Sequence, residues 1–416
     1  NYAVMDTRNL RRFMWIFLVT LSGSINLEFS EAKEMPRCQA SLHAAVRQPF
    51  FIDVGLELMK INEDHGKGFV FSPMKMLHKL TTLFALGSSL AEYGIMTYLG
   101  LSNECDGITL CKSFDMIVND MNSHLTSEVF LFSSWVYYQS NYEEEGLDFC
   151  ASPHEYNFHG DQETVLSGIN QRYREYCETN SPYLDHSLNS NSLFFILDVL
   201  KITPKIFGTI NRYESSLTFI DIDNYERKAS WLRIKGEIVC GKYTELTNCE
   251  YVRTYRAEIN DGKVYMLIFQ PMPDEYVRHE QITCIKEILS KLGDYIKFTI
   301  ETLSRPGRGW SKADSLVFPL LDMSTDVDLK PILEKNANLK QLFQQHQIPG
   351  INNGVLGVTL QELREWDYFN TKPENYDQLI PESNLLDSAF LIRPFVFAFV
   401  EKNTGMVLKT GTVLRI

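Results

Sequence analysis

Few residues in this 416-residue chain have the types and spacing that enzyme catalysis requires. A serine nucleophile elbow reads Gly-x-Ser-x-Gly, and the nearest stretch, Gly87-Ser-Ser-Leu, lacks the second glycine. The phosphate-binding pattern Gly-x-x-x-x-Gly-Lys-Ser/Thr and the dinucleotide pattern Gly-x-Gly-x-x-Gly do not occur. We therefore expect a protein that is not an enzyme and has no catalytic residue.

A metal site or another cofactor is not expected either. His154, Glu155 and His159 superficially resemble the His-Glu-x-x-His pair of zinc enzymes, but the two histidines are five residues apart. On a strand they would point to opposite faces. Asp221-Ile-Asp-Asn224 lacks the glycine and the closing glutamate of a calcium-binding loop.

Cysteine is the one residue type whose number suggests chemistry, namely disulfide formation. An even count in a secreted chain permits complete pairing, and no Cys-x-x-Cys redox or zinc motif is present. Short separations often close, so we expect Cys105–Cys111 and Cys240–Cys249 as local pairs. The eight cysteines are Cys38, Cys105, Cys111, Cys150, Cys177, Cys240, Cys249 and Cys284.

The net charge of −13 argues against a nucleic-acid partner, because nucleic-acid binding requires a basic surface. The same charge is weak evidence against binding an anionic polysaccharide. Hydrophobic residues make up 44% of the chain and charged residues 22%, which is the composition of a globular protein. The chain is long enough to bury a large core.

The N-terminus has the pattern of a secretory signal. A basic region with Arg8, Arg11 and Arg12 precedes a short apolar run over residues 13–21, and Ser22-Gly-Ser24 supplies small residues for cleavage. The run is too short to span a bilayer. A buried N-terminal helix is the alternative. We expect a leader and signal peptide at 1–24, an N-terminal extension at 25–44, and a secreted, extracellular protein.

Residues 45–416 show helical periodicity first and then many strands, which is typical of an α+β domain. Helices are expected over 44–63, 73–87, 90–101, 107–124, 169–178 and 282–292. Strands are expected over 69–71, 127–139, 154–159, 193–202, 264–269 and 315–319.

A hairpin closes the chain. Phe395, Phe397 and Phe399 alternate with smaller residues, which places three rings on one face of a strand. Asn403-Thr-Gly405 forms the turn, where Gly405 supplies the positive φ of a tight hairpin. Residues 406–414 return as the partner strand.

Taken in order, these segments resemble the serpin family over residues 45 to 414. The resemblance is carried by Phe69-Val-Phe-Ser-Pro73 leading into an apolar helix, by Pro271-Met-Pro-Asp-Glu275, by Ser315–Pro319 followed by an expected Asp326–Leu333 helix, and by the closing hairpin. It implies a serpin fold, an α+β architecture with three β-sheets, eight or nine helices and an exposed reactive-centre loop at about 371–388. Inhibitory serpins trap a protease when this loop is cut and inserts into the main sheet.

The chain departs from the family pattern at two places. Asp198 stands where the family usually has asparagine, and the aromatic-Lys-Gly-x-Trp signature that should follow is degraded at Pro204 and Ile206. The helix that is basic in heparin-binding members has Lys112 beside Asp115 and Asp120. Heparin binding is therefore not expected.

The reactive-centre loop can be aligned in two registers. Counting back from Arg393-Pro-Phe395 places the scissile bond near Ser383–Asn384. Aligning forward from Ile348-Pro-Gly-Ile351 makes 363–370 the preceding strand, so that Pro373 occupies the hinge glycine and the loop is several residues short. The hinge residues Thr371, Lys372, Pro373 and Glu374 replace the small residues of inhibitory members.

These hinge residues oppose insertion. Pro373 and Pro381 have no N–H group and are excluded from central strands. Lys372 and Glu374 are charges that insertion would bury or displace, which costs several kcal/mol if they are unpaired. We expect a secreted, monomeric serpin-family protein that is non-inhibitory and acts as a binding protein, carrier or cleavable precursor. The alternative is a serine-type endopeptidase inhibitor that traps proteases through the 371–388 loop. Expected partners are an extracellular protease or a small hydrophobic ligand, with no cofactor.

Overall fold

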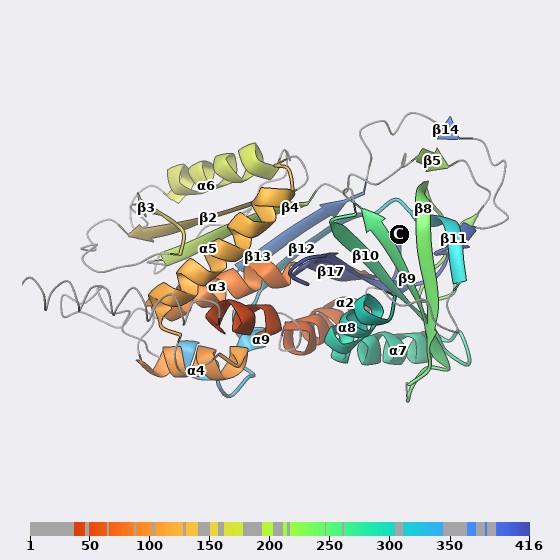
Figure 1. Ribbon diagram of the computed structural model, residues 1–416, viewed down its shortest axis with the longest axis horizontal. Helices are drawn as coiled ribbons and strands as arrows, with labels where there is room; N and C mark the ends of the chain where they lie inside the picture. Colours follow the sequence, from red (N-terminus) through yellow and green to blue (C-terminus); the bar gives the residue numbers. More distant parts are fainter. Residues whose placement is uncertain are drawn as a thin grey trace, which may run out of the picture.

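In the described residues, the fold is a large curved sheet with three smaller sheets and a set of helices packed around one main core (Figure 1). The structure, a computed structural model, describes residues 37–45, 50–64, 66–86, 89–101, 105–127, 130–139, 150–156, 162–177, 194–202, 211–213, 217–245, 247–259, 262–303, 311–343, 364–371, 379–380 and 388–416. The predicted leader and signal peptide at 1–24 lie outside these residues. Residues 37–45 are helical, and Cys38, Leu42 and Ala45 pack into the main core.

Ten strands form the largest sheet among the described residues. Its main path runs through β1 (Phe69–Phe71), β17 (Val407–Val413), β16 (Phe395–Glu401), β10 (Val264–Met272), β9 (Tyr251–Ile259), β8 (Trp231–Tyr243), β11 (Ser311–Pro319) and β15 (Ser388–Phe390). β5 (Asn211–Tyr213) pairs with β8, and β14 (Leu379–Ile380) pairs with β5. Because β1 pairs with β17, this sheet forms only when the two ends of the domain meet.

The large sheet bends along β8. The first half of β8 pairs with β5 and the second half with β9, while β11 follows the other edge. Gly236 lies between the halves with a φ of 152°, a conformation that residues with a Cβ rarely adopt. The ladder with β11 also shifts register between Ala313 and Ser315. The two halves therefore face in different directions.

Three smaller sheets complete the strands of the described regions. β3 (Ser152–Tyr156), β2 (Phe130–Gln139) and β4 (Phe194–Ile202) form one sheet, with α6 (Gln162–Cys177) lying across it (Figure 1). Trp135 and Leu197 of this sheet pack against Ile169 of α6 in a small second core. β12 (Asp322–Asp328) pairs with β13 (Arg364–Asn370), and β6 (Thr218–Ile220) pairs with β7 (Glu226–Lys228).

Helices cover the sheets in two groups. α2 (Leu56–Glu63), α7 (Arg278–Ser290) and α8 (Leu292–Leu303) lie along the large sheet, and α3 (Pro73–Leu86), α4 (Ser89–Leu99) and α5 (Gly107–His124) gather near the smaller sheets (Figure 1). Short turns occur at η1 (Phe50–Gly55), α9 (Lys330–Leu333) and η2 (Lys340–Phe343). No helix in the described part of the chain is long and apolar enough to span a membrane.

The central helix α3 begins as the sequence predicts. The Ser72 hydroxyl accepts a hydrogen bond from the Lys75 amide at 3.2 Å, which caps the helix at its first free N–H groups. The same hydroxyl donates to the carbonyl of Leu408 at 2.7 Å. The cap therefore also fixes the helix to β17.

The closing hairpin is confirmed. Gly405 has a φ of 69°, and the ring of Phe369 lies 5.4 Å from Phe397 and 5.0 Å from Phe399. The turn has an additional stabilising group in the fully buried Glu401, whose carboxylate accepts from the amides of Asn403 at 2.9 Å and Thr404 at 2.6 Å.

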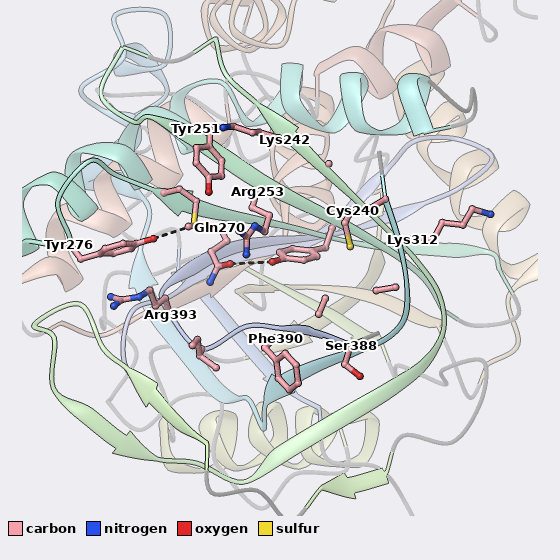
Figure 2. Close-up of a pocket in the computed structure, with 17 residues that line it drawn as sticks. Cys240, Lys242, Tyr251, Arg253, Gln270, Tyr276, Lys312, Ser388, Phe390 and Arg393 are labelled. Atoms are coloured by element: carbon pink, nitrogen blue, oxygen red, sulfur yellow. Dashed lines mark hydrogen bonds between the residues drawn. The ribbon is translucent and has the colours of Figure 1, made fainter. Parts of the chain in front are cut away.

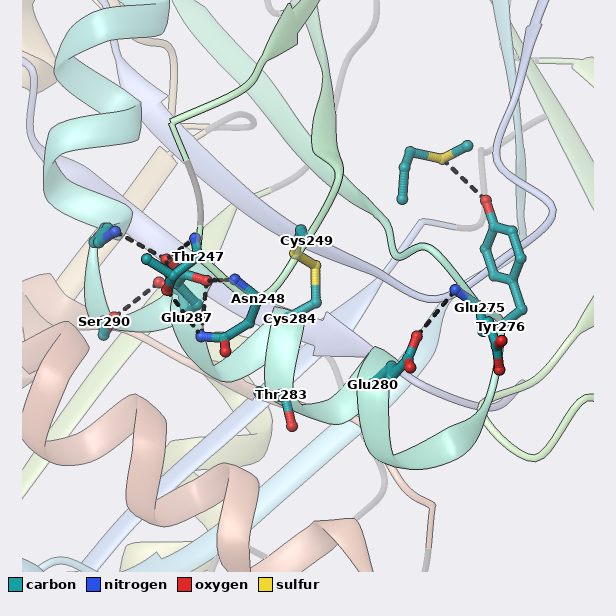
Figure 3. The surroundings of a disulfide bond; sticks show 12 residues. Thr247, Asn248, Cys249, Glu275, Tyr276, Glu280, Thr283, Cys284, Glu287 and Ser290 are labelled. Carbon is teal, nitrogen blue, oxygen red and sulfur yellow. Dashed lines mark hydrogen bonds and ion pairs between the residues drawn. A yellow bond between two sulfur atoms is a disulfide. The ribbon is translucent and has the colours of Figure 1, made fainter.

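Both predicted local disulfides are wrong. The structure pairs Cys38 with Cys105, Cys111 with Cys150, and Cys249 with Cys284, and it leaves Cys240 as a free thiol. Figure 3 shows the third bond, which fixes the segment before β9 to the middle of α7. Each of these bonds joins separate elements of the fold.

Geometry explains both errors. Cys105 lies before Asp106, the N-cap of α5, and is bonded to Cys38, whereas Cys111 lies within α5 and is bonded to Cys150. Cys240 pairs with Tyr255 inside the β8–β9 ladder, whereas Cys249 lies beyond the end of that ladder at Val252. With about 3.3 Å per residue, this places the two cysteines too far apart along the strand direction for a bond.

Several element boundaries also differ from the predictions. The helix expected over Asp326–Leu333 begins only at Lys330, because Asp326 to Asp328 pair with β13. Pro331 then lies in the first turn of α9, where its missing N–H is tolerated. In the region of the helix expected over 44–63, the structure describes the helical residues 37–45, η1 and α2, and α8 was not predicted.

Candidate functional site: the loop and the strands beside it

Thr371, the first residue of the predicted loop, directly follows β13. It is buried, its amide donates to the carbonyl of Leu321 at 3.0 Å, and its hydroxyl accepts from the Leu321 amide at 2.9 Å. β13 ends one residue earlier, at Asn370, after pairing with β12 along its whole length. The first predicted hinge residue is therefore held by the neighbouring strand. β13 also matches the strand over 363–370 in the second of the two loop registers.

The other predicted site residues lie outside the described residues. These are Lys372, Pro373, Glu374, Ser383 and Asn384. Within the loop the structure describes β14, where Leu379 and Ile380 pair in parallel with Arg212 and Tyr213 of β5. The loop ends at β15, where the hydroxyls of Ser388 and Ser315 are 2.6 Å apart.

Two strands, β4 and β13, are not paired with each other in the described part of the chain. In the described part of the chain β4 pairs only with β2, and β13 pairs only with β12. Each of the two strands therefore has one edge whose backbone N–H and C=O groups have no ladder partner there. Such an edge can accept an additional strand.

A buried charge cluster is centred on Asp198 of β4. Its carboxylate lies 3.0 Å from Nδ1 of His78 and 3.5 Å from Nζ of Lys79, both on α3. Ser134 of β2 donates its hydroxyl to the same carboxylate at 2.5 Å. His78 Nε2 lies 2.9 Å from the carbonyl of Cys150, which fixes the plane of the imidazole.

At this cluster, charge pairing affects the pKa values of Asp198 and His78 more strongly than burial does. Burial by itself raises the pKa of Asp198, but the charges of His78 and Lys79 and the hydrogen bonds lower the pKa well below its usual range. Burial lowers the pKa of His78, but Asp198 reverses this effect and the net pKa is raised. His78 therefore carries a proton, and a charge, at higher pH than a free histidine.

A second buried cluster is centred on Asp367 of β13. Its carboxylate oxygen Oδ1 lies 3.1 Å from Nζ of Lys75 on α3 and 3.3 Å from Nζ of Lys409 on β17, and all three side chains are at most 3% exposed. Burial raises the pKa of Asp367, and the two lysines outweigh burial, so that the pKa is lowered. The carboxylate is therefore ionised in the folded protein.

One helix holds both strands. Lys75, His78 and Lys79 are three and four residues apart, which places them on one face of α3. Lys75 contacts β13, and the other two contact β4. We call these three side chains, together with Asp198 and Asp367, the α3 clamp.

Of the α3 clamp residues, only Asp198 was identified from the sequence. One signal was available for the others: Lys75, His78 and Lys79 interrupt a helix whose remaining residues are almost all apolar. The partner Asp367 could not be found from spacing, because it is 292 positions from Lys75 and no local pattern marks it.

Of the residues considered for metal binding, the structure describes His154, Glu155 and Asp221 to Asn224. The described part of the chain contains no group of three or more His, Cys, Asp or Glu side chains that could hold a metal ion. Asp221 instead accepts from the amides of Asp223 and Tyr225 at 2.9 Å and from Arg227 at 2.8 Å, which stabilises the turn before β7. His154 lies on β3, and His159 lies outside the described residues.

Comparison with known proteins rests on structure alone. No protein-family model and no curated protein sequence matches the chain. Three solved structures cover 91% of it: human glycosylated kallistatin (TM-score 0.70, 16% identity, 99% of that chain), native protease nexin-1 with heparin (0.69, 14%, 100%) and a tumour suppressing serpin (0.68, 14%, 100%).

The fold is therefore the serpin fold. The element order of α+β type and the coverage of nearly the whole chain confirm the architecture expected from the sequence. At 14–16% identity, this likeness concerns the fold and not the activity.

Proposed function

We propose that this chain is a secreted, non-inhibitory protein of the serpin fold, which acts as a binding protein, carrier or cleavable precursor and not as an enzyme. The single observation that carries the proposal is the hinge. Lys372, Pro373 and Glu374 follow directly after Thr371, the buried residue that comes after the end of β13. Trapping requires this segment to enter a sheet as a central strand.

Whichever face of an inserted hinge strand points toward the interior, at least one charged side chain would be buried. Side chains on a strand alternate between its faces, so an inserted hinge would place either Lys372 and Glu374, or Asn375 and Asp377, toward the interior. Burying an unpaired charge costs several kcal/mol. Pro373 adds a missing N–H, which leaves a neighbouring carbonyl unpaired at a cost of about 1–3 kcal/mol. These costs act in the same direction.

The α3 clamp also opposes the movement that insertion demands. A strand inserted between β4 and β13 must be accommodated at about 4.8 Å from each of them. Both strands are ion-paired to the same face of α3, so a change in their separation strains Lys75–Asp367 or His78–Asp198. Breaking a buried ion pair costs about 3–5 kcal/mol.

One observation favours the alternative, a protease-trapping inhibitor. The facing edges of β4 and β13 have no ladder partner among the described residues, so a strand that entered there would find hydrogen-bonding groups on both sides. An experiment must therefore separate the two functions.

Incubation with trypsin-like, chymotrypsin-like and elastase-like proteases, followed by a denaturing gel, distinguishes the two functions. We expect cleavage within 371–388, or no cleavage, with the protease still active and no SDS-stable product at the summed mass. A band at the summed mass would contradict the proposal. The matched variant replaces the hinge by small residues, Lys372→Thr, Pro373→Ala and Glu374→Ala. Trapping by this variant alone would assign the defect to the hinge.

Secretion and the partners are parts of the same proposal. Three disulfides among the described residues fit an oxidising compartment. Protease nexin-1 is described with heparin, but the corresponding helix here, α5, has Lys112 with Asp115 and Asp120, which does not suit a polyanion. We propose a monomer whose partners are an extracellular protease or a small ligand.

A further inference from the structure

A cavity of about 710 Å³ lies on the concave side of the bend in β8 (Figure 2). β8, β9 and β10 form one wall, and β11, β15 and the residues after β15 form the other. The cavity faces away from α8, because Phe269 of β10 packs on Tyr295 of α8 while the next residue, Gln270, lines the cavity. Its volume is within the range of about 300–1,000 Å³ found for small-molecule sites.

The lining is positively charged, in contrast to the chain as a whole. The 17 lining residues include four cationic side chains and no aspartate or glutamate. In the full sequence, 53 acidic residues outnumber 40 basic residues. The four cations are Lys242, Arg253, Lys312 and Arg393.

Three of these cations have no carboxylate partner in the described part of the chain. Lys312 is paired at the rim with Glu237 at 2.7 Å. Lys242 lies 3.7 Å from the ring centre of Tyr251, and Arg393 lies 3.8 Å from that of Tyr276. Aromatic rings orient a cation without neutralising it. Arg253 projects from β9 next to Gln270 in Figure 2.

Aromatic side chains form much of the remaining wall. Tyr255 is only 2% exposed and donates its hydroxyl to Gln270 at 3.3 Å, and Phe390 enters from β15 (Figure 2). Burial raises the pKa of Tyr255 and of Tyr276, so both hydroxyls stay protonated. The cavity thus combines flat apolar surfaces with fixed positive charge and neutral hydrogen-bonding groups.

We propose that this cavity binds a small organic anion with an aromatic body. Arg253 and Arg393 would hold the anionic group, since guanidinium groups bind carboxylate and sulfonate oxygens with paired hydrogen bonds. The rings of Tyr251, Tyr276 and Phe390 would pack against the aromatic body. An inorganic anion would leave these rings in contact with water, so the walls favour an organic ligand. The inference rests on the proposed function, because it names the ligand class of a binding protein.

The test uses the full-length protein and two fluorescent probes of the same shape. Anilinonaphthalene sulfonate carries the anion, and phenylnaphthylamine is the neutral analogue without the sulfonate. We expect saturable, single-site binding of the sulfonate that is at least tenfold tighter than binding of the neutral probe, a difference of about 1.4 kcal/mol. Equal affinity for the two probes would overturn the proposal. This comparison needs no variant.

Variants locate the site. The double variant Arg253→Gln, Arg393→Gln should bind the sulfonate probe at least about tenfold more weakly and leave the neutral probe unchanged. Lys312→Gln, at a rim cation that is already paired, is the matched control and should change neither affinity. Unchanged sulfonate affinity in a folded double variant would overturn the assignment to this cavity. An excess of inorganic sulfate should not displace the probe, and displacement would contradict an aromatic site.

The protease-trapping gel on the same preparation separates this inference from the proposed function. Trapping together with charge-selective probe binding would reject the non-inhibitory role and leave the cavity assignment standing. Absence of trapping without charge-selective binding would reject the cavity and leave the non-inhibitory role standing.

Discussion

At the scale of single residues, the buried His78–Asp198 pair makes stability depend on pH. The pKa of His78 is raised, so its stabilising effect is complete below the unfolded value of about 6.5 and is lost as pH rises through the folded pKa. The pKa values of Asp198 and Asp367 are lowered, so their effects are complete above about pH 4 and are lost as pH falls further. The α3 clamp should therefore stabilise the fold most between about pH 4 and 6.5.

A comparison of the unaltered protein with His78→Asn tests this dependence. The difference in unfolding free energy, measured by denaturant titration, should be about 3–5 kcal/mol below pH 6.5 and should decrease at higher pH. His279→Asn at an exposed position of α7 is the control, and its difference should stay near zero. A difference for His78→Asn that is constant from pH 5 to 9 would show that the charge of this histidine does not stabilise the fold.

The structural roles of single residues were predictable from the sequence only where a local rule applies. The start of a helix at Pro73 and the role of Gly405 in a hairpin turn follow from the immediate neighbours, and both are confirmed. Asp367 and Lys75 lie far apart in the chain, and a carboxylate on a strand is ordinarily expected at the surface. Their pairing depends on the tertiary fold, which single-residue patterns do not specify.

At the scale of elements, α7 is joined to the segment before β9 by more than the Cys249–Cys284 bond. Glu287 of α7 accepts hydrogen bonds from the amides of Thr247 at 3.0 Å and Asn248 at 2.8 Å and pairs with Lys291 at 2.9 Å (Figure 3). Burial raises the pKa of Glu287, and these bonds outweigh burial, so that the pKa falls to about 2.

Glu287→Gln should therefore destabilise the protein by about 1–3 kcal/mol at neutral pH. Because the folded pKa is lowered, the difference should be complete above about pH 4.5 and should decrease as pH falls toward 2. Thermal melts over this pH range measure it. Glu280→Gln on the same helix, where the carboxylate accepts one exposed backbone bond from Glu275, is the matched control. A pH-independent loss in Glu287→Gln would contradict an electrostatic cause.

Element types were more predictable than element boundaries. Continuous apolar runs such as 194–202 and 264–269 are confirmed as buried strands, because both faces of these strands are covered. The division of the expected helix over 44–63 and the pairing of Asp326 to Asp328 with β13 depend on neighbours that lie far away in the sequence. The disulfide predictions were wrong for the same reason, because a short separation in the sequence does not show that two cysteines are close in the folded structure.

At the scale of the whole molecule, the edges of β4 and β13 are a place where a strand could be added. β4 and β13 each have a free edge among the described residues, and both are ion-paired to α3. An inserted loop would complete hydrogen bonding along the two edges and bury apolar area, so the cleaved protein would become far more stable than the intact one. The hinge and the α3 clamp predict instead that cleavage leaves the sheets as they are.

A thermal melt before and after a single cut in the loop distinguishes these states. Mass spectrometry would first confirm that the cut lies between Thr371 and Ser388. We expect the Tm to change by only a few degrees, since a change of about 1 kcal/mol shifts the Tm of a domain this large by about 2–4 °C or less. A large rise in Tm would show that the loop inserts despite Lys372, Pro373 and Glu374. The small-residue hinge variant, cut in the same way, is the reference: a large rise in that variant alone would place the barrier in the hinge, whereas no rise in either would place it in the α3 clamp.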